Sequence, residues 1–321
     1  MKRIALILPY WGMLPNYFQF FLESIRRNPT IDVLLFTDNK SDFDYPSNVH
    51  KYDMSFEQFK EKLQARFDFT LTHLQSPYRL CDFRPAYGYC LQEYLGCYDF
   101  WGHCDCDLIF GDIRSILTDN ILSRYDRILT RGHLTLYRNN CSTNTAFMDV
   151  CGGGKNFEVV FQSPPGRGWA WDEWGGTAGF WKENRSERLY DEIVFDDIDV
   201  DHKQFIASQR REQDHLGMKT NLCYLYSNGV LLRLCVENAH SVVSEPTLYV
   251  HLQKRNITVE CSNVNYDNYL IVPNRIIDYE EITVDKLKWW GRRRIFYFSS
   301  YKRRFGNFMA KIREYINGAE K

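Results

Sequence analysis

The first part of the chain alternates between compact aliphatic runs and amphipathic segments. Residues 4–8 (Ile-Ala-Leu-Ile-Leu) form an apolar run that Pro9 ends, and this predicts a buried strand. Apolar residues at 18, 21, 22 and 25 predict a helix that closes at Asn28-Pro29. Residues 33–38 predict a second buried strand. A strand, a helix and a strand in this order predict a right-handed βαβ unit and a parallel sheet.

The rest of the chain predicts further elements and three regions. Helices are expected at 56–67, from Pro85 to about residue 94 and at 113–125, loops at 78–84 and 152–179, and strands at 127–131, 247–251, 259–261 and 269–272. We expect a main α/β domain over 1–255, a short β-containing extension over 256–285 and a basic, aromatic, helical tail over 286–321.

Two carboxylates, Asp105 and Asp107, lie one residue apart between an aromatic run and a second apolar run. Residues i and i+2 of a strand point to the same face, so at a strand end these two oxygens would aim at one point. This arrangement suits Mg²⁺ or Mn²⁺ holding a diphosphate. The alternative is a pair of solvated turn residues. The apolar flanks favour the metal, because acids that end a buried element need neutralisation.

Composition excludes some classes of partner and favours others. The aromatic content of 16% suits stacking on bases and sugars, or an aromatic core, and the net charge of −1 gives no electrostatic signature of nucleic-acid binding. We find no signal-like segment and no run of about 20 apolar residues, so a cytoplasmic protein with reduced thiols is expected. His103, Cys104 and Cys106 have no second half of a zinc motif, so the cysteines are interpreted as small buried hydrophobic residues.

The last 36 residues have a different charge from the rest of the chain. Residues 286–321 contain eleven Lys and Arg against two Glu, interleaved with aromatic residues. A tail of this kind fits the surface of an anionic membrane, which would make the protein peripheral on the inner face. The alternative is a solvated helix that packs its rings on the main domain. The acidic remainder argues against nucleic acid.

Five segments together resemble a known class of enzyme. They are Leu8–Gly12, Phe36–Asp38, Leu80–Gly88, Trp101–Asp112 and His251–Lys254. In this order they resemble nucleotide-sugar glycosyltransferases of the GT-A type, most closely bacterial members linked to capsular or O-antigen polysaccharide synthesis. The resemblance implies a GT-A (Rossmann-like) mixed sheet flanked by helices, with a small C-terminal extension.

The resemblance also implies roles for particular residues. Asp105 and Asp107 correspond to the Asp-x-Asp metal motif, and His251 is similar in placement to a downstream histidine ligand. An imidazole beside carboxylates would favour Mn²⁺ over Mg²⁺. The expected contacts of the nucleotide sugar are Pro9, Tyr10, Thr37, Asp38, Asp82, Arg84, Asn144 and Lys254. The alternatives are that His251 is structural and that Asp82 and Arg84 form a structural ion pair.

The acceptor side is expected in Trp169-Ala-Trp-Asp-Glu-Trp174, where two acids lie among three indoles. Trp169, Trp171 and Trp174 would stack on sugar rings. A carboxylate in an apolar pocket acquires a raised pKa, so Asp172 or Glu173 could orient or deprotonate an acceptor hydroxyl. The alternative is that the tryptophans belong to the core and the acids to the surface.

These expectations combine into a metal-dependent hexosyltransferase. Its donor would be a nucleotide-diphosphate sugar with UDP as the carrier, its acceptor a glycan or a lipid-linked acceptor, and its stereochemistry retaining, as the histidine ligand of the resemblance implies. Two rivals stay open: a nucleotidyltransferase, which usually has a Gly-rich loop that Pro9-Tyr-Trp-Gly12 lacks, and a non-catalytic membrane-associated scaffold.

Overall fold

The computed structural model describes residues 1–150, 156–164, 168–173, 176–200, 204–208, 222–237, 240–253, 255–262 and 264–292. The chain forms two compact units. The first comprises residues 1–195 with 228–230 and 248–251, and the second comprises the other residues.

A seven-stranded mixed sheet forms the centre of the first unit. Its order is β3-β2-β1-β4-β7-β6-β8, with bounds β1 (Ile4–Pro9), β2 (Ile31–Thr37), β3 (Val49–Asp53), β4 (Phe100–Cys104), β6 (Arg127–Arg131), β7 (Leu134–Arg138) and β8 (Leu189–Tyr190). Strands β3, β2, β1 and β4 are parallel, whereas β7 runs antiparallel to both β4 and β6. The predicted βαβ start and the mixed α/β class are therefore confirmed.

Short helices surround this sheet, and two further strands lie beyond it. The helices are α1 (Phe18–Arg26), α2 (Phe56–Gln64), α3 (Tyr87–Cys90), α4 (Gln92–Leu95), α5 (Ile113–Ile116), α6 (Asp119–Arg124), α7 (Cys141–Asn144), α8 (Phe157–Phe161) and α9 (Thr177–Asn184), with 3-10 turns η1 (Pro77–Ala86), η2 (Ala146–Asp149) and η3 (Ser186–Arg188). Strand β5 (Leu108–Phe110) pairs antiparallel with β13 (Tyr249–His251).

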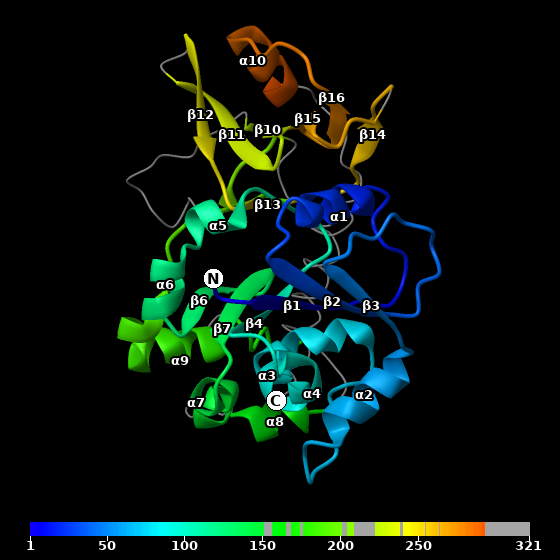
Figure 1. Ribbon diagram of the computed structural model, residues 1–321, viewed down its shortest axis with the longest axis vertical. Helices are drawn as coiled ribbons and strands as arrows, with labels where there is room; N and C mark the ends of the chain where they lie inside the picture. The colour runs from blue at the N-terminus through cyan, green and yellow to red at the C-terminus, as the bar shows by residue number, and fades with distance from the viewer. Residues whose placement is uncertain are drawn as a thin grey trace, which may run out of the picture. The chain divides into compact units, whose positions relative to one another are not determined.

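Alternation along the central strands divides the core between the two faces of the sheet. In β1, Leu6 belongs to a cluster with the apolar side of α1, whereas Ile7 belongs to a cluster with α2, α3 and α4. Figure 1 shows α1 on one face of β1 and β2, and α2, α3 and α4 on the other. Strands covered on both faces must be apolar throughout, which explains the continuous aliphatic runs. Cys104 and Cys106 also lie in this core, as expected.

The segment expected to be helical at 113–125 is helical but divided into α5 and α6. Two other local predictions are wrong, the first being that residues 78–84 are part of η1 rather than a loop. The expected loop at 152–179 contains α8 and the start of α9. Side-chain caps explain two of these starts, because Thr118 accepts a hydrogen bond from the N–H of Ile121 and Asn156 accepts one from Val159.

The second unit is built on a six-stranded sheet with the order β12-β11-β10-β15-β16-β14. Its strands are β9 (Asp196–Asp197), outside this sheet, and β10 (Cys223–Ser227), β11 (Val230–Glu237), β12 (Ser241–Pro246), β14 (Thr258–Glu260), β15 (Asn268–Val272) and β16 (Arg275–Asp278). Helix α10 (Val284–Arg292) packs Leu287 and Trp290 against apolar side chains of β10, β11 and β15.

The basic tail is described as far as residue 292, and the rest of that prediction lies outside the described residues. Within the described part of the chain, each helix is too short or too polar to cross a membrane.

Candidate functional site

Asp105, Asp107 and His251 converge in the first unit, with one potential ligand atom from each within 4.8 Å of the others. His251 Nε2 lies 3.2 Å from Asp107 Oδ1 and 4.0 Å from Asp105 Oδ2. Asp107 and His251 are buried, whereas Asp105 is partly exposed. The Asp-x-Asp motif and the distant histidine therefore share one small, poorly solvated region.

Strand pairing explains why residues so far apart in the chain meet. Asp105 directly follows β4, and Asp107 directly precedes β5. The antiparallel register of β5 and β13 sets His251 opposite Leu108, which is the residue after Asp107. A shift of one residue in this register would turn the imidazole to the other face of the pair.

The donor atoms of this cluster fit a divalent cation. Two carboxylates and one imidazole form a mixed oxygen and nitrogen set, which suits Mn²⁺ better than Mg²⁺. Burial of neighbouring acids is unfavourable unless a positive charge compensates them. Asp105, Asp107 and His251 would hold such an ion, and the ion would neutralise an anionic ligand at the same place.

Arg84 connects the acidic motif to the loop that contains Asp172. Its Nη2 donates to Asp105 Oδ1, while its Nη1 donates to Gly132 O at 2.7 Å and to Asp172 Oδ2 at 3.1 Å. Burial opposes the positive charge, but the carboxylates of Asp105 and Asp172 raise the pKa of Arg84 well above its usual value. Arg84 therefore pairs with these two acids rather than with Asp82, its partner in the alternative interpretation of a structural ion pair.

Asp172 and Glu173 lie side by side at this guanidinium. Burial raises the pKa of Asp172 to about 7, against the opposing effect of Arg84 and with a further contribution from Glu173. Glu173 Oε1 accepts a hydrogen bond from the N–H of Gly132 at 2.5 Å. A carboxyl group that titrates near neutral pH is suited to exchanging a proton with a bound hydroxyl.

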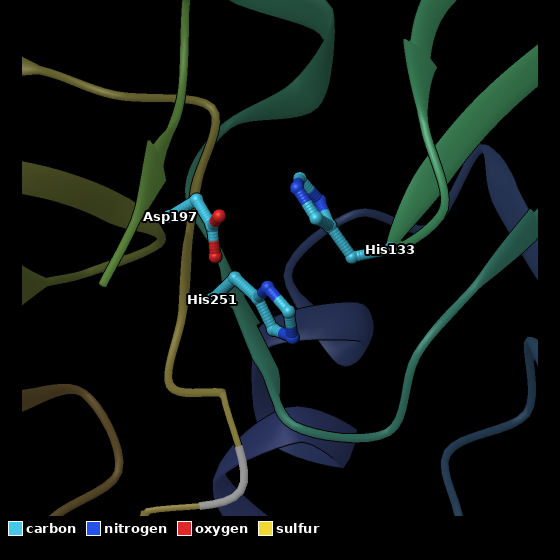
Figure 2. Close-up of side chains that lie close together, drawn as sticks. All are labelled: His133, Asp197 and His251. Atoms are coloured by element: carbon cyan, nitrogen blue, oxygen red, sulfur yellow. The ribbon is translucent and has the colours of Figure 1, made fainter. Parts of the chain in front are cut away.

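The turn between β6 and β7 supplies two residues that sequence reasoning missed, Gly132 and His133. Figure 2 shows His133 beside His251, with ring centroids 4.5 Å apart, and the Tyr249 hydroxyl lies 2.9 Å from His133 Nδ1. The backbone N–H of Asp105 donates to His133 O at 3.1 Å. A Gly-His pair at the end of the predicted strand 127–131 was the available signal. Asp197, also labelled in Figure 2, belongs to the second unit.

The expected nucleotide contacts at the strand ends lie along one edge of the sheet. Pro9 is opposite Phe36 in the parallel register of β1 and β2, which places Tyr10 and Asp38 at neighbouring strand ends. The Tyr10 hydroxyl donates to Met13 O, and burial, together with Cys106 and Asp107, raises its pKa to about 12. Thr37 is buried, and its hydroxyl accepts from the N–H of Asn39.

Three other expected contacts have their side chains in the interior. Asp82 is fully buried and accepts hydrogen bonds from the backbone N–H groups of Trp169 and Trp171. Asn144 accepts one from Trp101 Nε1 at 2.7 Å, and the ring of Trp171 packs edge-on against Phe161. These groups stabilise the fold here and present no open face to a ligand. Lys254 and Trp174 lie outside the described residues.

Fold and site together define a mixed α/β protein in which three side chains that could bind a metal ion meet at the carboxyl ends of parallel strands. The chain belongs to a family of unknown function (DUF6625), whose model matches residues 6–280. No curated protein matches the sequence. Among solved structures the chain is similar to mouse xyloside xylosyltransferase 1 in its apo form, with 10% identity, a TM-score of 0.36, and coverage of 66% of this chain and 90% of that one.

Proposed function

We propose that this protein is a metal-dependent glycosyltransferase of the GT-A type, which transfers a hexose from a nucleotide-diphosphate sugar, with UDP as the carrier, to a glycan or a lipid-linked acceptor. The observation that carries the proposal is the convergence of Asp105, Asp107 and His251 next to the ends of the parallel strands. In open α/β sheets, ligands bind at the carboxyl ends of the strands. A divalent cation, when bound, would neutralise charge on a diphosphate there.

The chain's own residues provide the other parts of such a reaction. Tyr10 and Asp38 stand at neighbouring strand ends, where a base and a ribose would lie. Arg84 keeps one oxygen of Asp105 and one of Asp172 in fixed positions. Asp172 or Glu173 would orient an acceptor hydroxyl by accepting a hydrogen bond from it, and Glu173 is the more exposed of the two.

Retention of configuration is our proposal for the stereochemistry. Inversion would instead require Asp172 or Glu173 to act as an in-line base. NMR spectroscopy of the anomeric proton of the product decides between the two outcomes.

The experiment that tests the function is turnover of UDP-hexoses with Mn²⁺. The purified protein should release UDP from at least one UDP-hexose, either to an acceptor sugar or slowly to water. EDTA should abolish the release and Mn²⁺ should restore it. Failure of UDP and Mn²⁺ to stabilise the protein against heat, together with no release of UDP from any UDP-hexose, would contradict the proposal.

The raised pKa of Asp172 predicts a pH dependence of stability. Below its ordinary pKa of 3.8 the carboxyl is protonated in both states, and between that value and about 7 only the folded state holds the proton. Because the folded state binds one more proton than the unfolded state in this range, the free energy of unfolding falls as the pH rises towards 7, by up to about 1.4 kcal/mol per pH unit. Urea titrations from pH 5 to 8 in EDTA should show wild type losing stability relative to Asp172→Asn. Parallel curves for the two proteins would refute the prediction.

Gly132→Ala should impair activity more than stability. A Cβ at this position would lie 2.7 Å from Glu173 Oε1 and 3.0 Å from both Arg84 Nη1 and Asp172 Oδ2. These atoms are ends of side chains, so they can move at a cost of about 1 kcal/mol, but the carboxyl groups are then displaced. A misplaced catalytic group costs on the order of 100-fold in rate. Turnover and urea unfolding should be measured together, with Gly179→Ala as the control, because nothing lies within 4 Å of that Cβ.

A further inference from the structure

An exposed indole lies in the same loop as the candidate acids Asp172 and Glu173. Trp169 is 36% exposed, although most tryptophans of the described first unit are buried or half-buried, and it precedes Asp172 by three residues. Its neighbour Trp171 is 1% exposed. The loop 168–173 therefore turns one ring towards solvent and the other into the core.

A continuous network of hydrogen bonds, which begins and ends at Trp169, fixes the position of this residue. The indole Nε1 donates to Ser163 Oγ at 2.9 Å, and Ser163 Oγ lies 2.9 Å from His73 Nδ1. His73 Nε2 lies 2.9 Å from Asp82 Oδ2, and this same oxygen accepts the backbone N–H of Trp169 at 3.0 Å. Both ends of the residue, its backbone and the edge of its ring, are thus tied to one network.

Ser163, His73 and Asp82 are the residue types of a nucleophilic triad, but a substrate could not reach the serine hydroxyl. His73 and Asp82 are fully buried, and Ser163 is 9% exposed. The Ser163 hydroxyl also contacts Val160 O at 2.8 Å and accepts from Trp169. A nucleophile has to reach its substrate, so these three residues serve to position the Trp169 loop. Burial opposes the charge on Asp82, but hydrogen bonds from His73, Trp171 and Trp169 lower its pKa.

A second exposed ring belongs to the same part of the surface. Tyr78 is 66% exposed, and the guanidinium of Arg79 lies 5.9 Å from the centroid of its ring. Arg79 Nη1 lies 2.9 Å from the point that a Cβ on Gly168 would occupy, and Gly168 is the residue before Trp169. Arg79 thus lies near both the ring of Tyr78 and the backbone next to Trp169, and its guanidinium carries up to five N–H donors.

We propose that Trp169 and Tyr78 form a stacking platform for a pyranose ring of a glycan acceptor; this rests on the proposed glycosyltransferase function. The C–H face of a pyranose packs on an aromatic ring, while its hydroxyl groups need polar partners around the rim. Arg79 supplies donors at this rim, and the acids Asp172 and Glu173 follow in the same loop. The charged guanidinium of Arg79 beside the ring of Tyr78 favours a sugar over an acyl chain.

The fixed position of the Trp169 indole would raise the affinity of such a platform for a weakly binding sugar. Ordering a free side chain on binding costs affinity, and a ring already held at its N–H edge avoids this cost. Ser163→Ala removes the acceptor of that N–H, so the ring is still present but is no longer held at its edge. This variant should therefore weaken sugar binding less than Trp169→Ala, which removes the ring.

Saturation-transfer NMR with cellobiose, lactose, maltose and chitobiose tests the platform directly. At least one disaccharide should receive saturation on its ring C–H protons from the wild-type protein, and Trp169→Ala should reduce this signal by about tenfold, as expected for loss of a stacked ring. Trp289→Ala is the matched control, because Trp289 is 54% exposed on α10 in the other unit. It should leave the signal unchanged.

The outcomes separate this inference from the proposed function. Thermal stabilisation by UDP with Mn²⁺ is measured on the same variants, and Trp169→Ala should retain it. If UDP with Mn²⁺ binds but no disaccharide is saturated, or if Trp169→Ala and wild type give equal signals, the platform is refuted and the function stands. If the signal depends on Trp169 while UDP with Mn²⁺ does not bind, the sugar site stands and the function fails.

Discussion

Asp107→Asn is expected to weaken Mn²⁺ binding by about 100-fold or more, because a direct ligand should contribute at least as much as the groups that orient ligands. The substitution keeps the shape of the side chain, and the amide can still hydrogen-bond to His251 Nε2, which lies 3.2 Å from Asp107 Oδ1. Asp107 is a cleaner target than Asp105, because Asp105 also binds Arg84. Isothermal titration calorimetry with MnCl₂ measures the affinity.

Asp112→Asn is the matched control for this experiment. Asp112 lies in the same acidic segment, but its carboxylate caps α5 by accepting hydrogen bonds from the N–H groups of Arg114 and Ser115. Asn is as good a cap as Asp, so neither Mn²⁺ affinity nor stability should change. If Asp107 instead served only the fold, Asp107→Asn would destabilise the metal-free protein and leave its Mn²⁺ affinity equal to that of the control.

Arg84→Met is expected to lower the free energy of unfolding by about 3 kcal/mol or more, the usual cost of removing one partner of a buried ion pair. The guanidinium is the shared partner of Asp105 and Asp172, whose side chains are 30% and 4% exposed. Methionine fills a similar volume but leaves Asp172 and Gly132 O without their donor. Urea unfolding at pH 8 measures the loss, because Asp172 is then charged in wild type.

A second substitution shows whether the stranded charge is the cause. In Arg84→Met/Asp172→Asn the buried carboxylate is gone, so part of the lost stability should return. Arg66→Met is the control, because Arg66 is exposed and its guanidinium lies over the ring of Tyr89. This substitution should lower the free energy of unfolding by less than about 1 kcal/mol. Equal losses in Arg84→Met and the double variant would contradict the proposed role of Arg84.

Local patterns predicted the start of the fold because each face of the central sheet is covered. The runs that became β1 and β2 are apolar on both faces, and the spacing of Phe18, Phe21 and Ile25 matches one side of α1. The hairpin of β10 and β11 was missed, although Asn228-Gly229 is the strongest short signal for such a turn. Both residues have positive φ, 48° and 88°, as that turn requires.

The candidate site could be predicted where its residues are neighbours in the sequence. It could not be predicted where strand pairing or loop packing brings distant residues together. Asp105 and Asp107 follow from spacing and apolar flanks alone. His251 was expected through a resemblance, but its place beside Asp107 depends on the register of β5 and β13, which no local pattern contains. The partners of Arg84 could not be foreseen either, because Asp172 approaches it through a loop that Asp82 ties to η1.

The same limit applies to His73 and Ser163. Neither stands out among the polar residues of its own segment, and their hydrogen bonds to one another and to Trp169 arise only when α8 packs against η1. The division into two compact units is equally non-local, because residues 228–230 and 248–251 belong to the first unit whereas the residues on either side of them belong to the second.

Anomalous diffraction from crystals soaked in MnCl₂ and UDP would locate the metal ion. We predict one manganese peak within coordination distance of Asp105, Asp107 Oδ1 and His251 Nε2, with diphosphate oxygens completing its shell. A map with UDP bound but manganese elsewhere, or with no manganese at these three side chains, would contradict metal binding by Asp105, Asp107 and His251.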